Sequence, residues 1–246
     1  MFETISGVAR LHGVVPATQY ACYRMLQQLA IVDVTQLMIQ STDEIAGNVA
    51  RANTQFRFLE PQEVRAFAQD PTNDLDANLA DRLSSGYDHC FGAVCDGQLA
   101  CYSWFALHSI EARNNSTSGS ARSGVSISYP EEYAFRYKGY THPDYRGRRL
   151  YSQTAQVAAA ALRDLGVHHV LSTAEWVNFS ALRSSYRSGF RDLGRIFLAE
   201  IFGKRILRCP DLSEDGIYFD EDASVYDRDQ PPSQQQPQQN AVFASV

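Results

Sequence analysis

Residues 141–156 read THPDYRGRRLYSQTAQ, and three of the four residues from Arg146 to Arg149 are arginines. The aromatic run before this stretch favours a strand, whereas the alanine-rich run after it favours a helix over about residues 148–165. A helix N-terminus presents unpaired backbone N–H groups and the positive end of the helix dipole. The stretch therefore predicts a strand-to-helix turn that binds an anion carrying at least one phosphate group.

The same arginines could instead be solvated side chains on a surface turn, and charge alone does not separate the two interpretations. The position of the turn between a strand and a helix favours the phosphate site. Other phosphate motifs are missing from the sequence. It contains no G-x-x-x-x-G-K-[ST], which argues against a P-loop nucleotidase, and no G-x-G-x-x-G. A G-x-S-x-G nucleophile elbow is missing as well.

The size and charge of the chain exclude several classes of protein. Its 246 residues suit one large domain with additions, and its net charge of −6 argues against a general binder of nucleic acid or anionic membranes. The N-terminus lacks the apolar segment of a signal peptide, and no apolar run approaches the roughly 18 residues that span a bilayer. We expect a cytoplasmic protein whose five cysteines are free thiols.

The order of expected elements indicates a mixed α/β sheet. Asp96-Gly97 separates two apolar and aromatic runs, 90–95 and 98–107, which predicts a hairpin because both turn positions need a positive φ. Helices and strands alternate around this hairpin, so the sheet is not a doubly wound parallel one. Further strands are expected at 55–60, 126–141, 167–175 and 192–207, and helices at 61–69, 74–86 and 178–189.

The chain divides into three expected parts. Residues 1–54 would form an N-terminal extension, with a helix over about 17–30 and a strand over about 31–40. The main domain would cover residues 55–210. The remaining segment, 211–246, is rich in Gln and Pro near its end and is expected to be disordered from about residue 229.

The run THPDYRGRRLY resembles the acyl-CoA-binding signature of the GNAT superfamily of N-acetyltransferases, R/Q-x-x-G-x-G/A. Arg146 matches the opening residue, and Gly147 matches a second glycine that is common in the family. Two residues depart from the signature, since Arg149 stands at its first required glycine and Tyr151 at its final glycine or alanine. An Arg149 that already has helical φ and ψ could still offer its N–H group to a phosphate.

A second block, NFSALRSSYRSGF, resembles the N-x-x-A…Y-x-x-x-G-F helix of the same family. Asn178, Ala181, Gly189 and Phe190 fall in register with it. The element order from residue 55 to about 207 matches the GNAT fold. The resemblance therefore implies a mixed, mostly antiparallel sheet flanked by helices.

By this resemblance, acetyl-CoA would lie in a V-shaped opening between the strand that ends near Thr141 and the strand that ends near Glu175. Its acetyl group would pass directly from the thioester to a primary amine of an unidentified acceptor. The residues implied in cofactor binding are Thr141, Arg146, Gly147, Arg148, Arg149, Leu150, Tyr151 and Asn178.

Direct transfer needs a base that takes a proton from the amine. Glu175 is the best-placed carboxylate, at the end of its strand. Glu131 and Glu132 lie far upstream of the arginine turn, and His142 belongs to the lead-in of the signature. Each of these carboxylates could also be a solvated residue at a strand end.

Direct transfer also needs an acid for the leaving thiolate. The family often uses a tyrosine four residues before the G-F glycine, and that position is Ser185 in this chain. Tyr186 is the next residue, about 100° further around the helix. We choose Tyr186 as the expected acid, with Ser185 or water as alternatives. No metal site is expected, because the side chains of the adjacent His168 and His169 would point to opposite faces of a strand.

Two other functions stay open at this point. Arg149, Tyr151 and the shifted tyrosine would also suit a catalytically inactive acyl-CoA-binding or regulatory module with the GNAT fold. The extra N-terminal residues could cover an acceptor site or support a homodimer. They would suit an aminoacyl or longer-chain acyl transferase that acts on cell-wall or polysaccharide precursors.

Overall fold

The computed structural model describes residues 5–29, 31–43, 53–75, 79–86, 88–110, 125–201 and 204–221. Eight strands form the main sheet: β1 Ile31–Ser41, β2 Thr54–Phe58, β3 Asp88–Cys95, β4 Gln98–Leu107, β7 Tyr133–Thr141, β8 His169–Glu175, β9 Arg191–Ile201 and β10 Lys204–Arg208. A smaller sheet consists of β5 Ser109–Ile110, β6 Val125–Ser128 and β11 Tyr218–Glu221. Six α-helices accompany them in these ranges: α1 Ile5–His12, α2 Val14–Leu29, α3 Pro61–Phe67, α4 Leu79–Ser84, α5 Leu150–Arg163 and α6 Phe179–Arg187.

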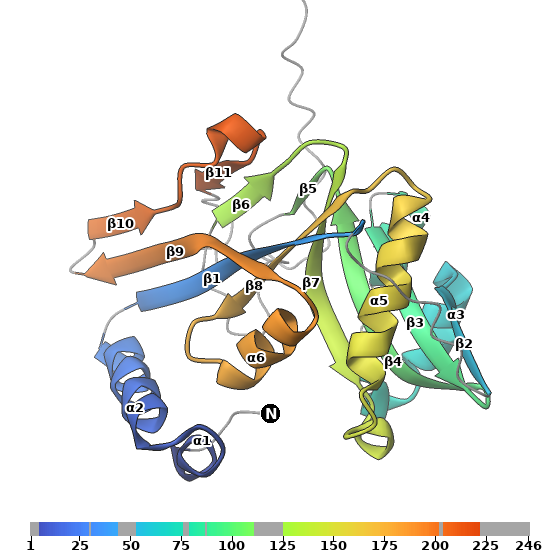
Figure 1. Cartoon of the computed structure of the whole chain (residues 1–246), viewed down its shortest axis with the longest axis horizontal. Coiled ribbons are helices and arrows are strands. Elements are labelled where there is room, and N and C mark those ends of the chain that lie inside the picture. Colours follow the sequence, from blue (N-terminus) through green and yellow to red (C-terminus); the bar gives the residue numbers. More distant parts are fainter. Residues whose placement is uncertain are drawn as a thin grey trace, which may run out of the picture.

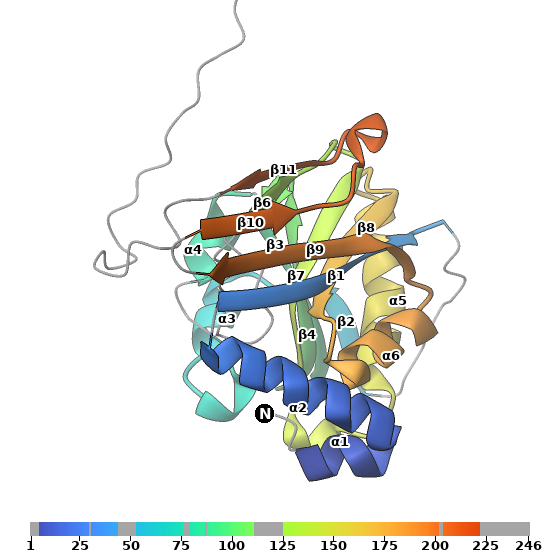
Figure 2. The ribbon, with the colours of Figure 1, turned by 90° about the vertical axis from the view of Figure 1, so that its left-hand side faces the viewer.

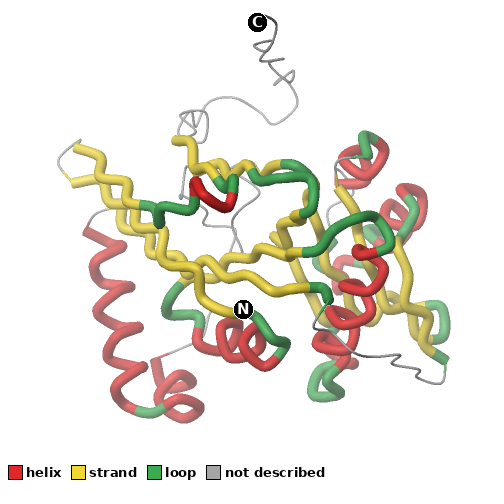
Figure 3. The backbone as a smooth tube through the Cα atoms, turned by 45° about the horizontal axis from the view of Figure 1, so that its top comes forward, coloured by secondary structure: helices red, strands yellow, loops and turns green. Residues whose placement is uncertain are grey.

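The main sheet has the strand order β10-β9-β1-β8-β7-β4-β3-β2 (Figure 1). Neighbouring strands run antiparallel, except for β7 and β8, which are parallel. The strands cross the middle of the molecule, with helices on both sides of them (Figure 3). The predicted fold class, a mixed and mostly antiparallel sheet flanked by helices, is confirmed.

The predicted hairpin is confirmed in β3 and β4. Asp96 and Gly97 connect the two strands with φ values of 49° and 82°, the positive values that a tight two-residue turn needs. Trp104 and Phe105 follow each other in β4 and point to opposite faces of the sheet, as side chains in a strand do. Each of them belongs to a different hydrophobic cluster.

Helices cover the sheet on both faces (Figure 2). On one face, α5 buries Ala158 and Leu162 against the cluster of Phe105, whereas α3 and α4 pack on the cluster of Trp104. The helix α2 lies beneath β1 and contributes Tyr20 and other residues to a third, smaller cluster. The strands β7 and β8 therefore lie in a sheet that helices cover on both faces.

The strand β1 lies in the interior of the sheet, between β8 and β9. Its residues Leu37 and Met38 are fully buried, one in each of the two main clusters. The strand that we expected within an N-terminal extension thus pairs with two neighbours in the main sheet, β8 and β9. The division of the chain at residue 54 stays a prediction.

Three further expectations meet the structure in different ways. None of the helices in the described ranges is long and apolar enough to cross a membrane. The five cysteines are free thiols, and Cys90, Cys95 and Cys101 are buried in the hairpin. The tail that is expected to be disordered from about residue 229 lies outside the described residues.

Candidate functional site

The strands β7 and β8 separate after a short paired region. Tyr133–Arg136 of β7 pair with His169–Ser172 of β8, and the last residues of the two strands do not pair with each other. In the ladder with β4, Lys138 lies opposite Trp104 and Arg136 opposite Phe105, so Tyr137 is the extra residue of a β-bulge. A bulge bends its strand and interrupts pairing. The two strands therefore part at the place where the resemblance implies an opening.

The arginine turn lies between the end of β7 and the start of α5. Gly147 and Arg149 have positive φ values of 74° and 56°. The first hydrogen bond of the helix runs from the Gln153 N–H group to the Arg149 carbonyl, at 3.2 Å. The amides of residues 150–152 therefore have no acceptor four residues before them, which is the condition for anion binding at a helix N-terminus.

Two sequence expectations about this turn are corrected. The helix begins at Leu150 rather than at 148, because left-handed residues cannot continue an α-helix. Arg149 was expected in helical φ and ψ, but it is the left-handed N-cap residue of α5. Its backbone thus takes the conformation that a glycine adopts without strain.

The arginine side chains of the turn lie against tyrosine rings. The Arg146 Nε donates to the Thr141 carbonyl at 3.2 Å, and its guanidinium lies 5.8 Å from the centre of the Tyr140 ring. Arg148 lies 5.3 Å from the centre of the Tyr145 ring. These arginines are exposed at the mouth of the opening, where cation–π contacts limit their freedom without neutralising their charge.

Tyr151, the second departure from the signature, lies over Gly139 of β7. A Cβ atom placed on Gly139 would lie only 2.6 Å from the Tyr151 hydroxyl oxygen. Because Gly139 has no side chain, β7 leaves space for the Tyr151 ring. In the signature, a small residue at the helix position would leave this space instead. Sequence reasoning missed Gly139, because nothing local marks it as the neighbour of residue 151.

Thr141 and Asn178 have structural partners. The Thr141 hydroxyl donates to the Cys101 sulfur at 3.4 Å. The Asn178 side chain accepts from the Ala181 N–H group at 3.1 Å and so caps α6. The cap fixes the helix that borders the opening on the β8 side.

Glu175 lies at the end of β8, as expected, and is paired with Arg24 of α2. Arg24 donates to both carboxylate oxygens, at 2.9 and 2.6 Å, and Gln27 adds a hydrogen bond at 3.4 Å. Only 13 % of the Glu175 side chain is exposed. A bidentate guanidinium holds a carboxylate in one orientation.

Asp33 of β1 is a second carboxylate at this corner, and sequence reasoning missed it. Thr35 and Tyr23 donate to it at 3.3 and 3.4 Å. Burial raises the pKa of Asp33, and the negative charge of Glu175 raises it further. The available signal was a single acidic residue within the apolar, β-branched run IVDV.

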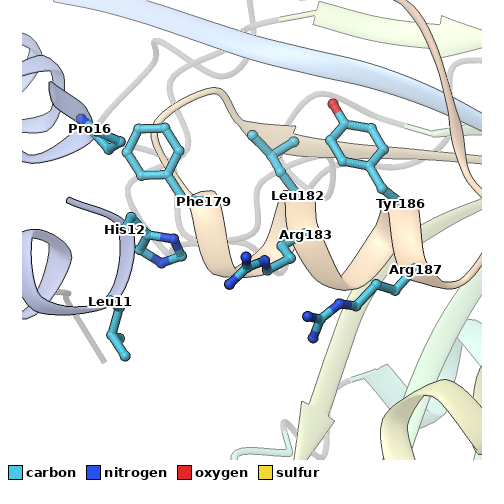
Figure 4. A pocket seen from close by; sticks show the side chains of 8 residues that line it. All are labelled: Leu11, His12, Pro16, Phe179, Leu182, Arg183, Tyr186 and Arg187. Atoms are coloured by element: carbon cyan, nitrogen blue, oxygen red, sulfur yellow. The ribbon is translucent and has the colours of Figure 1, made fainter.

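Tyr186 points away from the opening. Its hydroxyl donates to Asp192 Oδ1 at 2.7 Å, and 43 % of the residue is exposed. Burial raises the pKa of Tyr186 to about 12, with a further contribution from the Asp192 hydrogen bond. The ring borders a groove of about 610 Å³ between α1, α2 and α6 (Figure 4), lined by Leu11, His12, Pro16, Phe179, Leu182, Arg183, Tyr186 and Arg187.

Ser185 faces the opening instead. It is 4 % exposed, and its Oγ accepts a hydrogen bond from Arg136 Nη2 at 3.2 Å. Arg136 was not among the expected site residues. One helical position separates Ser185 from Tyr186, and that 100° rotation decides which side chain reaches the opening.

The weaker candidates for the base lie elsewhere. Glu131 and Glu132 are exposed before the start of β7, at the opposite end of the strand from Thr141. His142 accepts from the Asp144 N–H group at 3.3 Å and lies 3.0 Å from the Thr72 hydroxyl, so it fixes the turn. Within the described ranges, no group of three or more His, Cys, Asp or Glu residues is arranged to hold a metal ion.

No model of a known protein family matches the sequence, and no curated protein matches it. Solved structures that it resembles include a GCN5-related N-acetyltransferase from Sphaerobacter thermophilus, at 14 % identity and a TM-score of 0.47 over 78 % of this chain and 57 % of that one. A GNAT-family acetyltransferase from Colwellia psychrerythraea has 14 % identity and a TM-score of 0.45, over 72 % and 60 %. A tandem GNAT protein of the clavulanic acid pathway has 16 % identity and a TM-score of 0.45, over 78 % and 59 %. The chain spans less than two thirds of each of these proteins, and they are named for the superfamily that the two sequence blocks resemble.

Proposed function

We propose that this protein is an acyl-CoA-dependent N-acyltransferase that moves an acetyl-type group from a thioester to a primary amine. One observation carries the proposal: β7 and β8 separate beside the N-terminus of α5, and three arginines lie at the mouth of that opening. The opening would receive the pantetheine arm and the acyl group. The amides of residues 150–152 and the guanidinium groups of the turn would bind the pyrophosphate.

The reaction forms one bond and breaks another. The amine nitrogen bonds to the thioester carbonyl carbon, the carbon–sulfur bond breaks, and CoA leaves as a thiolate that takes up a proton. The amine loses its proton to a base. A backbone N–H group at the Tyr137 bulge is our candidate for the donor to the carbonyl oxygen, since a bulge leaves amides outside the ladder.

Glu175 is our candidate for the base, with Arg24 holding its carboxylate in place. Asp33 is the alternative at the same corner. Burial raises the pKa of Asp33, which makes its carboxylate more basic than that of an ordinary aspartate. For the acid, Tyr186 could act only after leaving Asp192, whereas Ser185 already faces the opening.

The first test is the binding of CoA and acetyl-CoA, measured by calorimetry and by the shift in melting temperature. Arg146→Ala should weaken binding roughly tenfold or more, since a hydrogen bond to a charged group contributes about 1.5–3 kcal/mol. Arg163→Ala is the matched control and should bind like the wild type, since it removes a half-buried arginine at the other end of α5 that lies 3.9 Å from Asp43. Equal binding by wild type and Arg146→Ala would show that the turn is not the phosphate site.

The second candidate function is a binding or regulatory module without transferase activity. It is favoured by the engagement of both expected catalytic side chains, Glu175 with Arg24 and Tyr186 with Asp192. Release of free CoA thiol in the presence of a mixed panel of amines separates the two functions. Amine-dependent release supports the transferase, whereas CoA binding without release supports the module.

A further inference from the structure

Arg136 is a buried arginine at the apex of the opening between β7 and β8. It is the last residue of β7 that pairs with β8, and it is only 5 % exposed. Its side chain lies on the face of the sheet covered by α5 and α6, where it lines a small cavity with Ala155 of α5 and Phe190. An acyl group that enters from the arginine turn would point toward this apex.

The Arg136 guanidinium has few polar partners. Nη2 donates to Ser185 Oγ at 3.2 Å, and the Phe190 and Tyr151 rings lie 4.4 and 5.5 Å from the guanidinium carbon. Within the described part of the chain, no carboxylate lies within ion-pair distance of it. A guanidinium carries five N–H donors, and Ser185 Oγ is the one side-chain acceptor recorded for them among the described residues.

Two other arginines of the same fold show the usual arrangement. Arg24, which is less deeply buried, is paired with Glu175, and Arg82 is paired with the buried carboxylate of Asp88. A buried charge is normally paired, because burial removes its hydration. The two aromatic rings and the serine hydroxyl offset only part of that loss for Arg136. A buried guanidinium without a carboxylate partner in the protein can bind an anionic group of a ligand.

We propose that Arg136 binds a carboxylate at the far end of the acyl group, so that the preferred donors are dicarboxylic thioesters of CoA such as malonyl-CoA or succinyl-CoA. This inference rests on the proposed function and extends its donor beyond acetyl-CoA. The thioester would lie near the Tyr137 bulge, and the acyl chain would continue toward the apex. The cavity beside Arg136 measures about 10 Å³, which is room for one water or one carboxylate oxygen.

Ser185 contributes to this arrangement by its size. It occupies the position at which the resembling family often has a tyrosine, and it contacts Arg136 from α6. Because the Ser185 side chain is small, the Arg136 guanidinium has room at the apex. The Ser185 hydroxyl orients the guanidinium by accepting its hydrogen bond. Ser185 is therefore a positioning residue for Arg136.

The experiment compares the Kd values of succinyl-CoA and butyryl-CoA, which have acyl chains of equal carbon number and differ in the terminal carboxylate. Binding is measured by calorimetry without an amine, so the acceptor need not be known. Wild type should bind succinyl-CoA at least tenfold more tightly than butyryl-CoA. Arg136→Met should remove or reverse that preference, whereas the matched control Arg163→Met should keep it.

Two results would overturn the inference. One is equal affinity of the wild type for succinyl-CoA and butyryl-CoA, a comparison that needs no variant to fold. The other is an Arg136→Met variant in which the Kd values of both ligands rise by the same factor, because Arg136 would then contact a part of the molecule that both donors share. Unacylated CoA separates this inference from the proposed function: failure of CoA itself to bind contradicts the function, whereas CoA binding without a preference contradicts only the role of Arg136.

Discussion

At the scale of single residues, the turn after β7 accommodates two residues that its signature does not predict. Arg149 takes a left-handed conformation, and Tyr151 lies over Gly139, where no side chain obstructs it. The turn requires a backbone direction and free space, and a glycine at a fixed position is only one way to provide them. At both positions the local geometry accommodates a residue that departs from the signature.

Replacement of Arg149 by glycine should stabilise the protein. A left-handed conformation costs a residue with a Cβ atom roughly 1–2 kcal/mol, and the greater freedom of glycine in the unfolded chain offsets part of that gain. We expect the free energy of unfolding to rise by up to about 1 kcal/mol in urea denaturation. Arg149→Ala, which keeps a Cβ atom, is the control and should show no gain. Equal stability of the two variants would mean that the backbone at 149 is not strained.

At the scale of elements, one ion pair joins the N-terminal helix α2 to the end of β8. Arg24 and Glu175 are separated by 151 positions in the chain and form two hydrogen bonds. The contact fixes the corner at which both candidate bases lie. A carboxylate that looks like a free strand-end base in the sequence is thus held in the structure by a distant arginine.

Arg24→Met should lower the free energy of unfolding by about 2 kcal/mol. That value lies between the near-zero effect of an exposed pair and the larger effect of breaking a buried one, because the two side chains are 28 % and 13 % exposed. A second change, Glu175→Gln, should recover part of the loss, since it removes the unpaired charge. Arg163→Met should change stability by less than about 0.5 kcal/mol. If the double variant loses as much free energy of unfolding as the two single variants together, the ion pair contributes no interaction energy.

At the scale of the whole molecule, the sheet is completed by a strand from the beginning of the chain. The strand β1 lies between β8 and β9 and pairs with both along most of its length. The strands that border the opening on the β8 side therefore depend on residues before 54. We therefore expect the N-terminal region and the strands around the opening to fold together, which the deletion below tests.

Deletion of residues 1–50 should abolish folding. The deletion would remove both ladders of β1 and the fully buried Leu37 and Met38. The stabilisation lost in this way exceeds the usual free energy of unfolding of a domain. We expect no cooperative thermal transition by circular dichroism and no CoA binding. Deletion of 229–246, which the composition predicts to be disordered, should leave the melting temperature unchanged. A truncated protein that melts cooperatively and binds CoA would instead support a separate N-terminal extension.

The sequence by itself determined the local elements and the concentration of arginines at the turn. The Asp96-Gly97 hairpin, the helices of residues 61–67 and 179–187, and the strand-turn-helix around Arg146 all follow from patterns within about ten residues. Steric preference, hydrophobic periodicity and capping act over such short distances. For this reason the fold class and the position of the strand-to-helix turn could be predicted, whereas anion binding by that turn stays a prediction.

Only the tertiary structure decided the partners across the chain. In the structure β1 lies inside the sheet, and Glu175 pairs with Arg24. Tyr186 donates a hydrogen bond to Asp192, and Arg136 is buried beside Ser185. These outcomes depend on contacts between residues far apart in sequence, and no local pattern specifies which of many compatible partners will meet. The physical reason is that packing and charge pairing are settled together, by the burial of the whole sheet at once.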